Sequence, residues 1–360
     1  MQATSGTRAT ERSGMQQETQ LDSRGPDLGA ALHGDQHAFE GLTEPYRGEL
    51  QVHCYRMLGS VSDAEDMVQE TFLRAWKGRR SFAGRAPFRA WLYRIATNAC
   101  LDELEARPRR GLPMSYRAAA DADEPPEPPR LEPIWLEPYP DALLPAASAD
   151  PAARYEQRES IRLAFLVALQ DLPPRQRAIL LLRDVLGWSA AEVASMLDLT
   201  VSSVTSALYR ARSTLSARYR GGDRASSGAT LDDTTERRLL ERYLQAWETA
   251  DIDGLTLLLK EDATFPMPPA PVWYRGRAAI RAFISATILS GAARGRWKLL
   301  PTRANGQPAF AFYRRQEEKP VYTPFAIQVV TFESELVADA TTFGFPQLFG
   351  RFGLPEEIRA

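Results

Sequence analysis

Apolar residues recur at helical spacing through the first third of the chain. Between residues 33 and 106, runs of apolar side chains lie three or four positions apart, which is typical of amphipathic helices. These positions are Phe39, Leu42, Tyr46 and Leu50, then Val68, Phe72, Leu73 and Trp76, and finally Trp91, Leu92, Ile95, Ala96 and Ala99. We therefore predict an all-helical unit over 33–106.

A second helical unit is predicted over 154–220, and its end has the pattern of a helix-turn-helix. Two short amphipathic segments, 188–200 and 201–215, are separated by a turn in which Asp198 tolerates a left-handed backbone. The second segment begins with small hydroxylated residues and carries arginines further on, a composition that suits a DNA major groove. A helical hairpin within a bundle is the alternative.

The third predicted unit, 231–360, mixes helices and strands. Helical patterns lie near 239–247 and 277–289, and four strand-like runs follow at 296–303, 308–314, 324–333 and 336–342. Helices followed by antiparallel strands predict an α+β cone. The fold class is therefore multidomain, with two all-α units and a C-terminal α+β unit.

Two segments have the composition of linkers. Residues 107–153 carry 11 of the 26 prolines, which block helix formation and favour a semi-rigid extended tether. Within it, Trp135 and Tyr139 are too apolar for a simple spacer, so either they pack on a neighbour or the tether lies in a channel. Residues 221–230 are predicted to be a flexible linker, and 1–32 are predicted to be disordered.

Charge along the chain is more informative than the nearly neutral total of 44 basic and 46 acidic residues. Residues 61–70 contain four acids and no base, whereas residues 71–94 contain seven bases and no acid. This change predicts two neighbouring surfaces for two partners, one basic and one polyanionic. A pair of solvated faces is the alternative.

Cysteine use and hydropathy bear on the compartment. Cys54 and Cys100 lie in apolar helical context without metal-ligand spacing, which indicates a reduced intracellular protein. No apolar run is long enough for a membrane span, and no signal peptide is recognisable. We expect a cytoplasmic protein that does not contact a membrane.

Aromatic and basic residues alternate around the loop at 81–88. Aromatic rings that stack on bases, together with arginines that follow the backbone, are what single-stranded DNA binding requires. The alternative is that Trp76, Phe82, Phe88 and Trp91 belong to the core.

These motifs resemble a known family. Asp-Ala-Glu-Asp-Met-Val-Gln-Glu-Thr-Phe-Leu-Arg-Ala-Trp at 63–76 and Phe-Arg-Ala-Trp-Leu-Tyr-Arg-Ile-Ala-Thr-Asn-Ala-Cys-Leu-Asp at 88–102 closely resemble region 2 of the sigma factors of bacterial RNA polymerase. Leu-Pro-Pro-Arg-Gln-Arg-Ala at 172–178, followed by the helix-turn-helix, is similar to region 4. The absence of a region 3 between them is typical of the extracytoplasmic-function group.

The resemblance implies two partners, the RNA polymerase core and promoter DNA. An acidic helix would dock on the coiled coil of the largest polymerase subunit through Asp63, Glu65, Asp66, Gln69 and Glu70. A basic and aromatic stretch would melt and hold the −10 element through Arg74, Lys77, Arg79, Arg80, Ser81, Phe82, Arg85, Phe88, Trp91, Arg94 and Asn98. The linker would run through the polymerase toward the RNA exit path.

The second unit would read the −35 element in duplex DNA. Arg175, Arg177, Arg210 and Arg212 are the candidates for phosphate contacts, and Ser202, Ser203, Thr205 and Ser206 for base edges. Members of this group often carry basic residues where this chain has Thr205 and Ala207. Because fewer phosphate contacts weaken salt-dependent affinity, we expect only modest −35 binding by this unit alone.

The third unit resembles the SnoaL-like group of the nuclear-transport-factor-two fold, a known C-terminal extension of actinobacterial sigma factors. A pocket in it could be lined by Trp273, Tyr274, Tyr313 and Tyr322. We expect it to regulate activity through a small-molecule ligand or an intramolecular contact, with no cofactor and no metal.

An enzymatic role for the third unit is the alternative, as an isomerase or hydrolase fused to a DNA-binding module. Such chemistry needs a positioned acid–base group. His33, His37 and His53 all lie in the first unit, which leaves Asp262 and Asp339 as candidates. We expect no catalytic activity. A simple helix-turn-helix repressor is a further alternative, but it would need neither the acidic helix nor the loop at 81–88.

Overall fold

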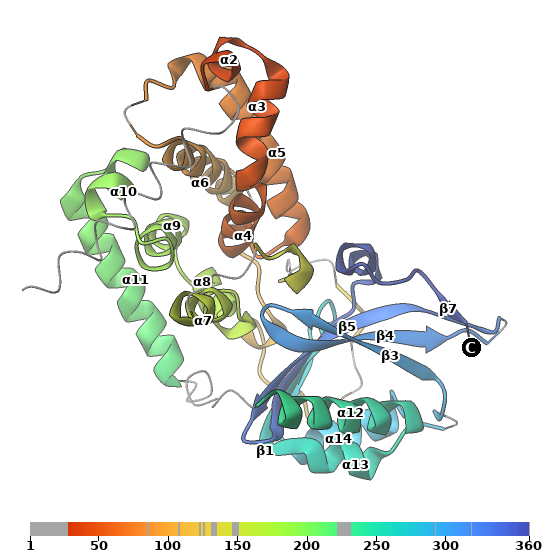
Figure 1. Ribbon diagram of the computed structural model, residues 1–360. Coiled ribbons are helices and arrows are strands. Elements are labelled where there is room, and N and C mark those ends of the chain that lie inside the picture. Colours follow the sequence, from red (N-terminus) through yellow and green to blue (C-terminus); the bar gives the residue numbers. More distant parts are fainter. Residues whose placement is uncertain are drawn as a thin grey trace, which may run out of the picture.

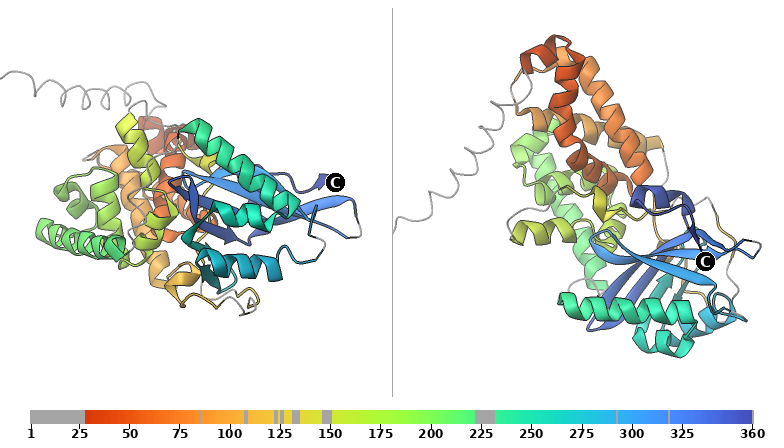
Figure 2. Two further views of the ribbon diagram at one scale, coloured as in Figure 1. Left: turned by 90° about the horizontal axis from the view of Figure 1, so that it is seen from below. Right: turned by 45° about the vertical axis from the view of Figure 1, so that its right-hand side comes forward.

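The computed structural model describes residues 28–84, 86–106, 109–121, 124, 127–130, 135–145, 151–221, 232–291, 293–317 and 319–359. Two helical units lie side by side, and a curved sheet backed by helices packs below them (Figures 1 and 2). This arrangement confirms the predicted fold class of two helical units and one α+β unit.

The N-terminal unit is helical, as predicted. Its helices are α2 (Leu28–His33), α3 (Gln36–Thr43), α4 (Arg47–Leu58), α5 (Val61–Gly78) and α6 (Phe88–Ala106), with 3-10 turns η1 (Glu44–Tyr46) and η2 (Arg79–Ser81). Helix α4 ends at Gly59 in the left-handed conformation, and Ser60 caps α5 by accepting a hydrogen bond from the Asp63 backbone. Leu73, one of the apolar positions of the helical pattern, is 53% exposed on α5.

The second unit contains the predicted helix-turn-helix. It consists of α7 (Pro151–Glu159), α8 (Leu163–Gln170), α9 (Pro174–Leu180), the π-helical segment η5 (Leu181–Val185), α10 (Ala190–Met196) and α11 (Val201–Gly221). A capping box formed by Ser189 and Glu192 starts α10. Asp198 in the turn has a φ of 52°, the left-handed conformation expected of it.

The two helical units share one hydrophobic core. Leu50 and Met57 of the first unit and Leu166 and Ile179 of the second belong to the same buried cluster. Across this contact, the Arg56 guanidinium donates to the Ser160 backbone oxygen and to its hydroxyl, at 3.1 and 2.5 Å. Burial lowers the pKa of Arg56 to about 10, so the guanidinium is desolvated at this contact and Ser160 replaces part of its hydration.

The C-terminal unit is a mixed sheet with helices on its concave side. Helices α12 (Asp233–Thr249), α13 (Ile252–Leu258) and α14 (Arg277–Ala286) accompany strands β1 (Leu259–Pro266), β2 (Trp273–Arg275), β3 (Trp297–Ala304), β4 (Gln307–Arg315), β5 (Val321–Glu333), β6 (Leu336–Phe343) and β7 (Ile358–Arg359). The order is β2-β1-β6-β5-β4-β3, with β7 against β5. The four predicted strands, β3 to β6, pair antiparallel as expected, whereas β1, which was not predicted, runs parallel to β6.

Both faces of this sheet are covered, which explains why β4 is buried along seven of its nine residues. Aromatic residues of α12 and α14 pack on the inner face, where Tyr243 stacks on Phe310 with ring centroids 5.4 Å apart. The outer face packs against Leu112 and Leu136 of the linker and against the 3-10 helix η6 (Pro346–Phe352).

The linker packs on its neighbours over the residues that are described. Trp135 and Tyr139 are both buried, which decides between the two alternatives in favour of packing. The Tyr139 ring lies 4.7 Å from that of Tyr55 in α4. Short 3-10 turns, η3 (Pro113–Ser115) and η4 (Asp141–Leu143), break the otherwise extended path.

Candidate functional sites

The N-terminal half of α5 is engaged by other parts of the chain. Asp63 forms an ion pair with Arg110 of the linker at 2.5 Å, and the Glu65 carboxylate accepts hydrogen bonds from Arg351 of η6 at 3.0 to 3.2 Å. Arg351 therefore has a raised pKa, chiefly through its hydrogen bond to Glu65. Two of the five acidic-helix candidates thus contact the linker and the C-terminal unit.

The linker also caps the start of this helix. The Glu137 carboxylate accepts from the Ser60 hydroxyl at 3.0 Å and from the Val61 backbone N–H at 2.9 Å. A carboxylate at a helix N-terminus satisfies backbone donors and meets the positive end of the helix dipole. Glu137 was not among the sequence candidates, and nothing in the local pattern relates it to a helix 76 residues away.

The middle of α5 presents an exposed stripe. Asp66, Gln69, Leu73 and Lys77 are all exposed and lie three or four residues apart, so they share one helix face. Leu73 is the member that the sequence reasoning missed, and its exposed side chain adds an apolar surface between Gln69 and Lys77. Beside the stripe, Glu70 forms an ion pair with Arg74, which also pairs with Asp102.

The aromatic residues around the loop at 81–88 form one cluster. Phe82, Phe88 and Trp91 lie with ring centroids 5.2 to 5.6 Å apart. Phe88 is buried at the base of the cluster, whereas Phe82 and Trp91 are half-exposed and retain surface for a base to stack on. The alternative that these aromatic residues belong to the core therefore fits Phe88 better than Phe82 or Trp91.

The basic candidates of this stretch differ in their surroundings. The Arg79 guanidinium lies over the Trp76 ring at 4.0 Å, and Arg94 pairs with Asp198 of the second unit at 3.3 Å. Lys77, Arg80 and Ser81 are exposed and Asn98 is half-buried, while Arg85 lies outside the described residues.

Helix α11 presents its first turns to solvent. Ser202, Ser203, Thr205, Ser206 and Arg210 are exposed, while Val204 and Leu208 pack inward. Thr200 caps the helix by accepting from the Ser203 backbone at 3.1 Å. Arg212 is exposed too, but it is held by Asp184 through two contacts of 2.9 and 2.6 Å.

Tyr209 is a residue of this surface that the sequence reasoning missed. Its ring is 76% exposed, and it lies one turn after Thr205 and Ser206 on the outer face of α11. The helical spacing from these hydroxylated residues was the signal that could have identified it.

Arg177 lies in a different environment from the other phosphate candidates. Arg175 is exposed, but Arg177 is only 2% exposed and donates to the backbone oxygens of Gln170, Leu172 and Met57. Burial lowers its pKa to about 10. In this structure its guanidinium satisfies carbonyl groups between α4 and α9, so it does not face a phosphate.

The four aromatic candidates of the C-terminal unit do not line one cavity. Tyr274 is in the inner cluster, stacked on Phe283 at 4.3 Å, whereas Tyr313 and Tyr322 belong to the cluster on the outer face of the sheet. The Trp273 indole N–H donates to the Arg117 backbone oxygen of the linker. The expected pocket is therefore corrected to an aromatic core, one edge of which is covered by the linker.

The acid–base candidates of this unit are engaged in other contacts. Asp339 accepts hydrogen bonds from Thr264 and Thr341 at 2.5 and 2.7 Å, and Asp262 is exposed beside Lys260 at 3.7 Å. Among the described carboxyl groups, burial raises the pKa of Asp141, which lies in the linker. The described ranges contain no group of His, Cys, Asp and Glu that could hold a metal ion, and none of their helices has the length and hydropathy of a bilayer span.

Three family models match the chain. Sigma-70 region 2 matches residues 42–110, Sigma-70 region 4 matches residues 162–215, and the SnoaL-like domain matches residues 240–340. The order of these matches is that of the three predicted units.

Known relatives match along most of the chain. It is 46% identical over 323 residues to the ECF RNA polymerase sigma factor SigG of Mycobacterium tuberculosis (strain ATCC 25618 / H37Rv), covering 89% of this chain and 85% of that one. It is 31% identical over 187 residues to the ECF RNA polymerase sigma factor SigW of Bacillus subtilis (strain 168), covering 52% and 91%. The crystal structure of the extracytoplasmic function sigma factor SigJ of Mycobacterium tuberculosis has a similar fold, with a TM-score of 0.56 and 24% identity over 88% of this chain and 99% of that one.

Proposed function

Because the chain belongs to the ECF RNA polymerase sigma factors, with a SnoaL-like domain at its C-terminus, we propose that it binds the core polymerase through α5 and directs it to promoters. The exposed stripe of Asp66, Gln69 and Leu73 is the part of α5 that would make the first contact. We further propose that it acts in the cytoplasm, where the polymerase is.

The two DNA surfaces have different roles. The half-exposed rings of Phe82 and Trp91, with the neighbouring basic residues, would hold unpaired bases of the −10 element. The first turns of α11 would enter the major groove of the −35 element, with Tyr209 and the hydroxylated residues toward the base edges and Arg175 and Arg210 toward phosphates.

The observation that carries the regulatory part of this proposal is the direct contact between the two DNA-binding units. The −10 and −35 elements are about 25 base pairs apart, which is about 85 Å of duplex at 3.4 Å per base pair. Here, Arg94 forms an ion pair with Asp198, and the Tyr93 ring lies 4.8 Å from that of Trp188. This arrangement cannot span both elements, so we propose that it is a closed resting form that must open on the polymerase.

The turn between β3 and β4 supports the proposal that the SnoaL-like domain holds this form together. Asn305, fully buried with a φ of 57°, donates to the Tyr55 hydroxyl and to the Ile161 backbone oxygen, both at 2.9 Å. Its side-chain oxygen accepts from the Tyr139 backbone at 2.9 Å. One side chain thus contacts the first helical unit, the linker and the second helical unit, and its loss would leave buried polar groups without partners.

We propose a regulatory role for this domain and no catalytic role. Its concave side is filled by Tyr243, Trp247, Phe310 and Phe312, and the Tyr243 hydroxyl is used in a hydrogen bond to Gln328 at 2.7 Å. These aromatic side chains occupy the positions from which an acid–base group would have to reach a substrate.

The polymerase contact is tested with Asp66→Ala in the full-length chain, with Glu40→Ala as a control that removes an exposed helical carboxylate elsewhere in the same unit. We expect Asp66→Ala to weaken binding to purified core polymerase about tenfold and to reduce promoter-specific run-off transcription accordingly. The control should match the wild type. Equal affinities for all three proteins would contradict the assignment of this surface.

A further inference from the structure

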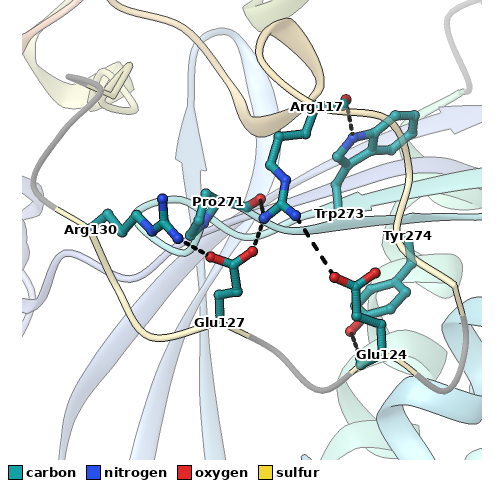
Figure 3. A network of polar contacts seen from close by, with 7 residues as sticks. All are labelled: Arg117, Glu124, Glu127, Arg130, Pro271, Trp273 and Tyr274. Atoms are coloured by element: carbon teal, nitrogen blue, oxygen red, sulfur yellow. Dashed lines mark hydrogen bonds and ion pairs between the residues drawn. The ribbon is translucent and has the colours of Figure 1, made fainter.

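The linker covers the edge of the sheet at the mouth of the SnoaL-like cone. Strand β2 is the last strand on its side of the sheet, and such an edge presents unpaired backbone groups that can accept another chain segment. The Ala120 backbone N–H donates to the Trp273 oxygen at 2.9 Å. The Trp273 indole donates back to the Arg117 oxygen at 3.0 Å (Figure 3). Ala120 also packs against the hydrophobic core of the cone.

Further contacts extend this docking along the linker. The Tyr274 hydroxyl donates to the Glu124 backbone oxygen at 3.0 Å, and the Arg130 backbone N–H donates to the Pro269 oxygen at 2.9 Å. The Arg117 guanidinium points to the Pro271 oxygen at 3.4 Å and pairs with Glu127 and Glu124 (Figure 3). The linker thus follows the cone mouth over a stretch that we call the docked segment. Its described residues with contacts to the cone or to one another are Arg117, Ala120, Glu124, Glu127 and Arg130.

This docking is loose enough to be reversible. A cavity of about 190 Å³ remains between the linker and the cone, lined by Arg117, Ala118, Ala119, Ala120, Glu124, Pro271 and Val272. The Arg117 and Glu124 side chains are more than one-third exposed, and exposed ion pairs contribute little to stability. An incompletely packed and partly solvated contact of this kind opens more readily than a core.

On either side of the docked segment, the linker closes on itself in a neck beside the start of α5. Gly111 and Trp135 form a parallel β-bridge, the Leu136 N–H donates to the Gly111 oxygen at 3.0 Å, and the Trp135 indole donates to the Arg130 oxygen at 2.7 Å. This neck carries Arg110, which pairs with Asp63, and Glu137, which caps α5. The same short stretch of chain therefore touches both the cone mouth and the start of the polymerase-binding helix.

We infer that the docked segment is a built-in peptide ligand of the cone mouth, and that its docking keeps the linker neck on α5 and so limits access of the core polymerase to Asp63 and the start of that helix. The inference rests on the proposed function for the assignment of the polymerase as the partner of α5. The docking of the segment on the cone does not depend on that assignment. Release of the segment from the cone frees the neck, and binding of the polymerase to α5 favours release, because coupling between two sites is reciprocal.

The test uses full-length Arg117→Ala, which removes the side-chain part of the docking without changing the cone. Arg238→Ala is the matched control, because Arg238 forms an exposed ion pair with Glu335 in the same domain away from the linker. Ala120→Asp is a second variant, which places a charge against the apolar core of the cone mouth. Hydrogen exchange of the peptide 113–121 and affinity for core polymerase are measured for all of them.

We expect exchange in 113–121 to accelerate and polymerase affinity to rise about fivefold in both linker variants, with neither effect in the control. If hydrogen exchange of 113–121 is unchanged in both linker variants, the proposal that the segment is docked is wrong. If exchange is faster but polymerase affinity is unchanged, the proposed coupling between the docking and α5 is wrong. If even the wild type fails to bind polymerase, the proposed function fails and the coupling falls with it, whereas the exchange data still decide whether the segment is docked.

Discussion

Helix α5 and helix α11 carry the two candidate recognition surfaces. Other parts of the chain contact the surface on α5 but leave the start of α11 exposed. At α5, Asp63 and Glu65 are held by Arg110 of the linker and Arg351 of the C-terminal unit. At the start of α11, by contrast, Ser202, Ser203 and Thr205 all face solvent. The difference is consistent with our proposal that the linker and the SnoaL-like domain restrain polymerase binding and the spacing between the units more than recognition of the −35 element.

The largest effect is expected from loss of Asn305. Asn305→Gly keeps a residue that tolerates the positive φ but leaves the Tyr139 N–H and the Ile161 oxygen without their partner, at about 1–3 kcal/mol each. We expect the closed form to open, seen as a larger radius of gyration in small-angle scattering and faster tryptic cleavage of the linker. Ser334→Gly, a similar change in the exposed β5–β6 turn, is the control. A variant as compact as the control would show that Asn305 does not hold the units together.

The second largest effect is expected in the pH dependence of folding stability. It tests whether the surfaces on α5 and α11 unfold independently of each other. His53 is buried against Thr97, and burial lowers its pKa to about 3 from the ordinary 6.5. Between these values the unfolded chain binds a proton that the folded chain does not, so stability rises with pH across this window and is lost as the pH falls, by about 1.4 kcal/mol per unit.

His53→Gln removes this titration and should flatten the dependence between pH 6 and pH 4 in chemical denaturation. Because regions 2 and 4 share one core, probes on α5 and α11 should report the same loss in the wild type. Separate transitions for the two helices, or equal slopes for wild type and variant, would argue against this reasoning.

A smaller effect is expected at the exposed surface. Arg210→Ala should weaken binding to a −35 duplex about tenfold and reduce the slope of log affinity against log salt by about one, the loss of one phosphate contact. Core polymerase affinity should not change. Arg212→Ala is an informative comparison, because Asp184 already holds Arg212 and a smaller loss is expected there. If the slope of log affinity against log salt is the same in Arg210→Ala as in the wild type, Arg210 does not contact a phosphate.

The smallest effect is expected at the contact between η6 and α5. The Arg351–Glu65 pair is about one-third exposed on both sides, at 31% and 34%, so it contributes at most about 1 kcal/mol. Arg351→Ala should therefore raise polymerase affinity about threefold at low salt and less at high salt. A decrease in affinity would mean that Arg351 itself assists the polymerase contact.

Much of the fold could be predicted because the relevant signals are local. The helix-turn-helix and the strands β3 to β6 follow from residue periodicity, and the predicted strands agree with the observed ones to within a few residues. The family resemblance rested on two motifs within the helical units and is confirmed.

Side-chain environments were predicted less well. Strand alternation already separates Phe310 and Phe312 from Tyr313, since neighbouring residues face opposite sides of a sheet, and this excludes Tyr313 from the inner pocket. The sequence predicts an exposed Arg177, because nothing local indicates that its guanidinium is buried. The carbonyl groups that accept its hydrogen bonds come from three separate positions of the chain. The contacts that occupy α5 join residues 47 and 286 positions apart, and no local pattern specifies such pairs.

The central claim, that the chain's own contacts restrain polymerase binding rather than −35 reading, is tested most directly by two affinities of one variant. Full-length Asn305→Gly and the wild type are each titrated with core polymerase and, separately, with a −35 duplex at the same salt concentration. We predict that the variant binds polymerase at least tenfold more tightly while its duplex affinity changes less than twofold. A larger change for the duplex than for the polymerase would contradict the account.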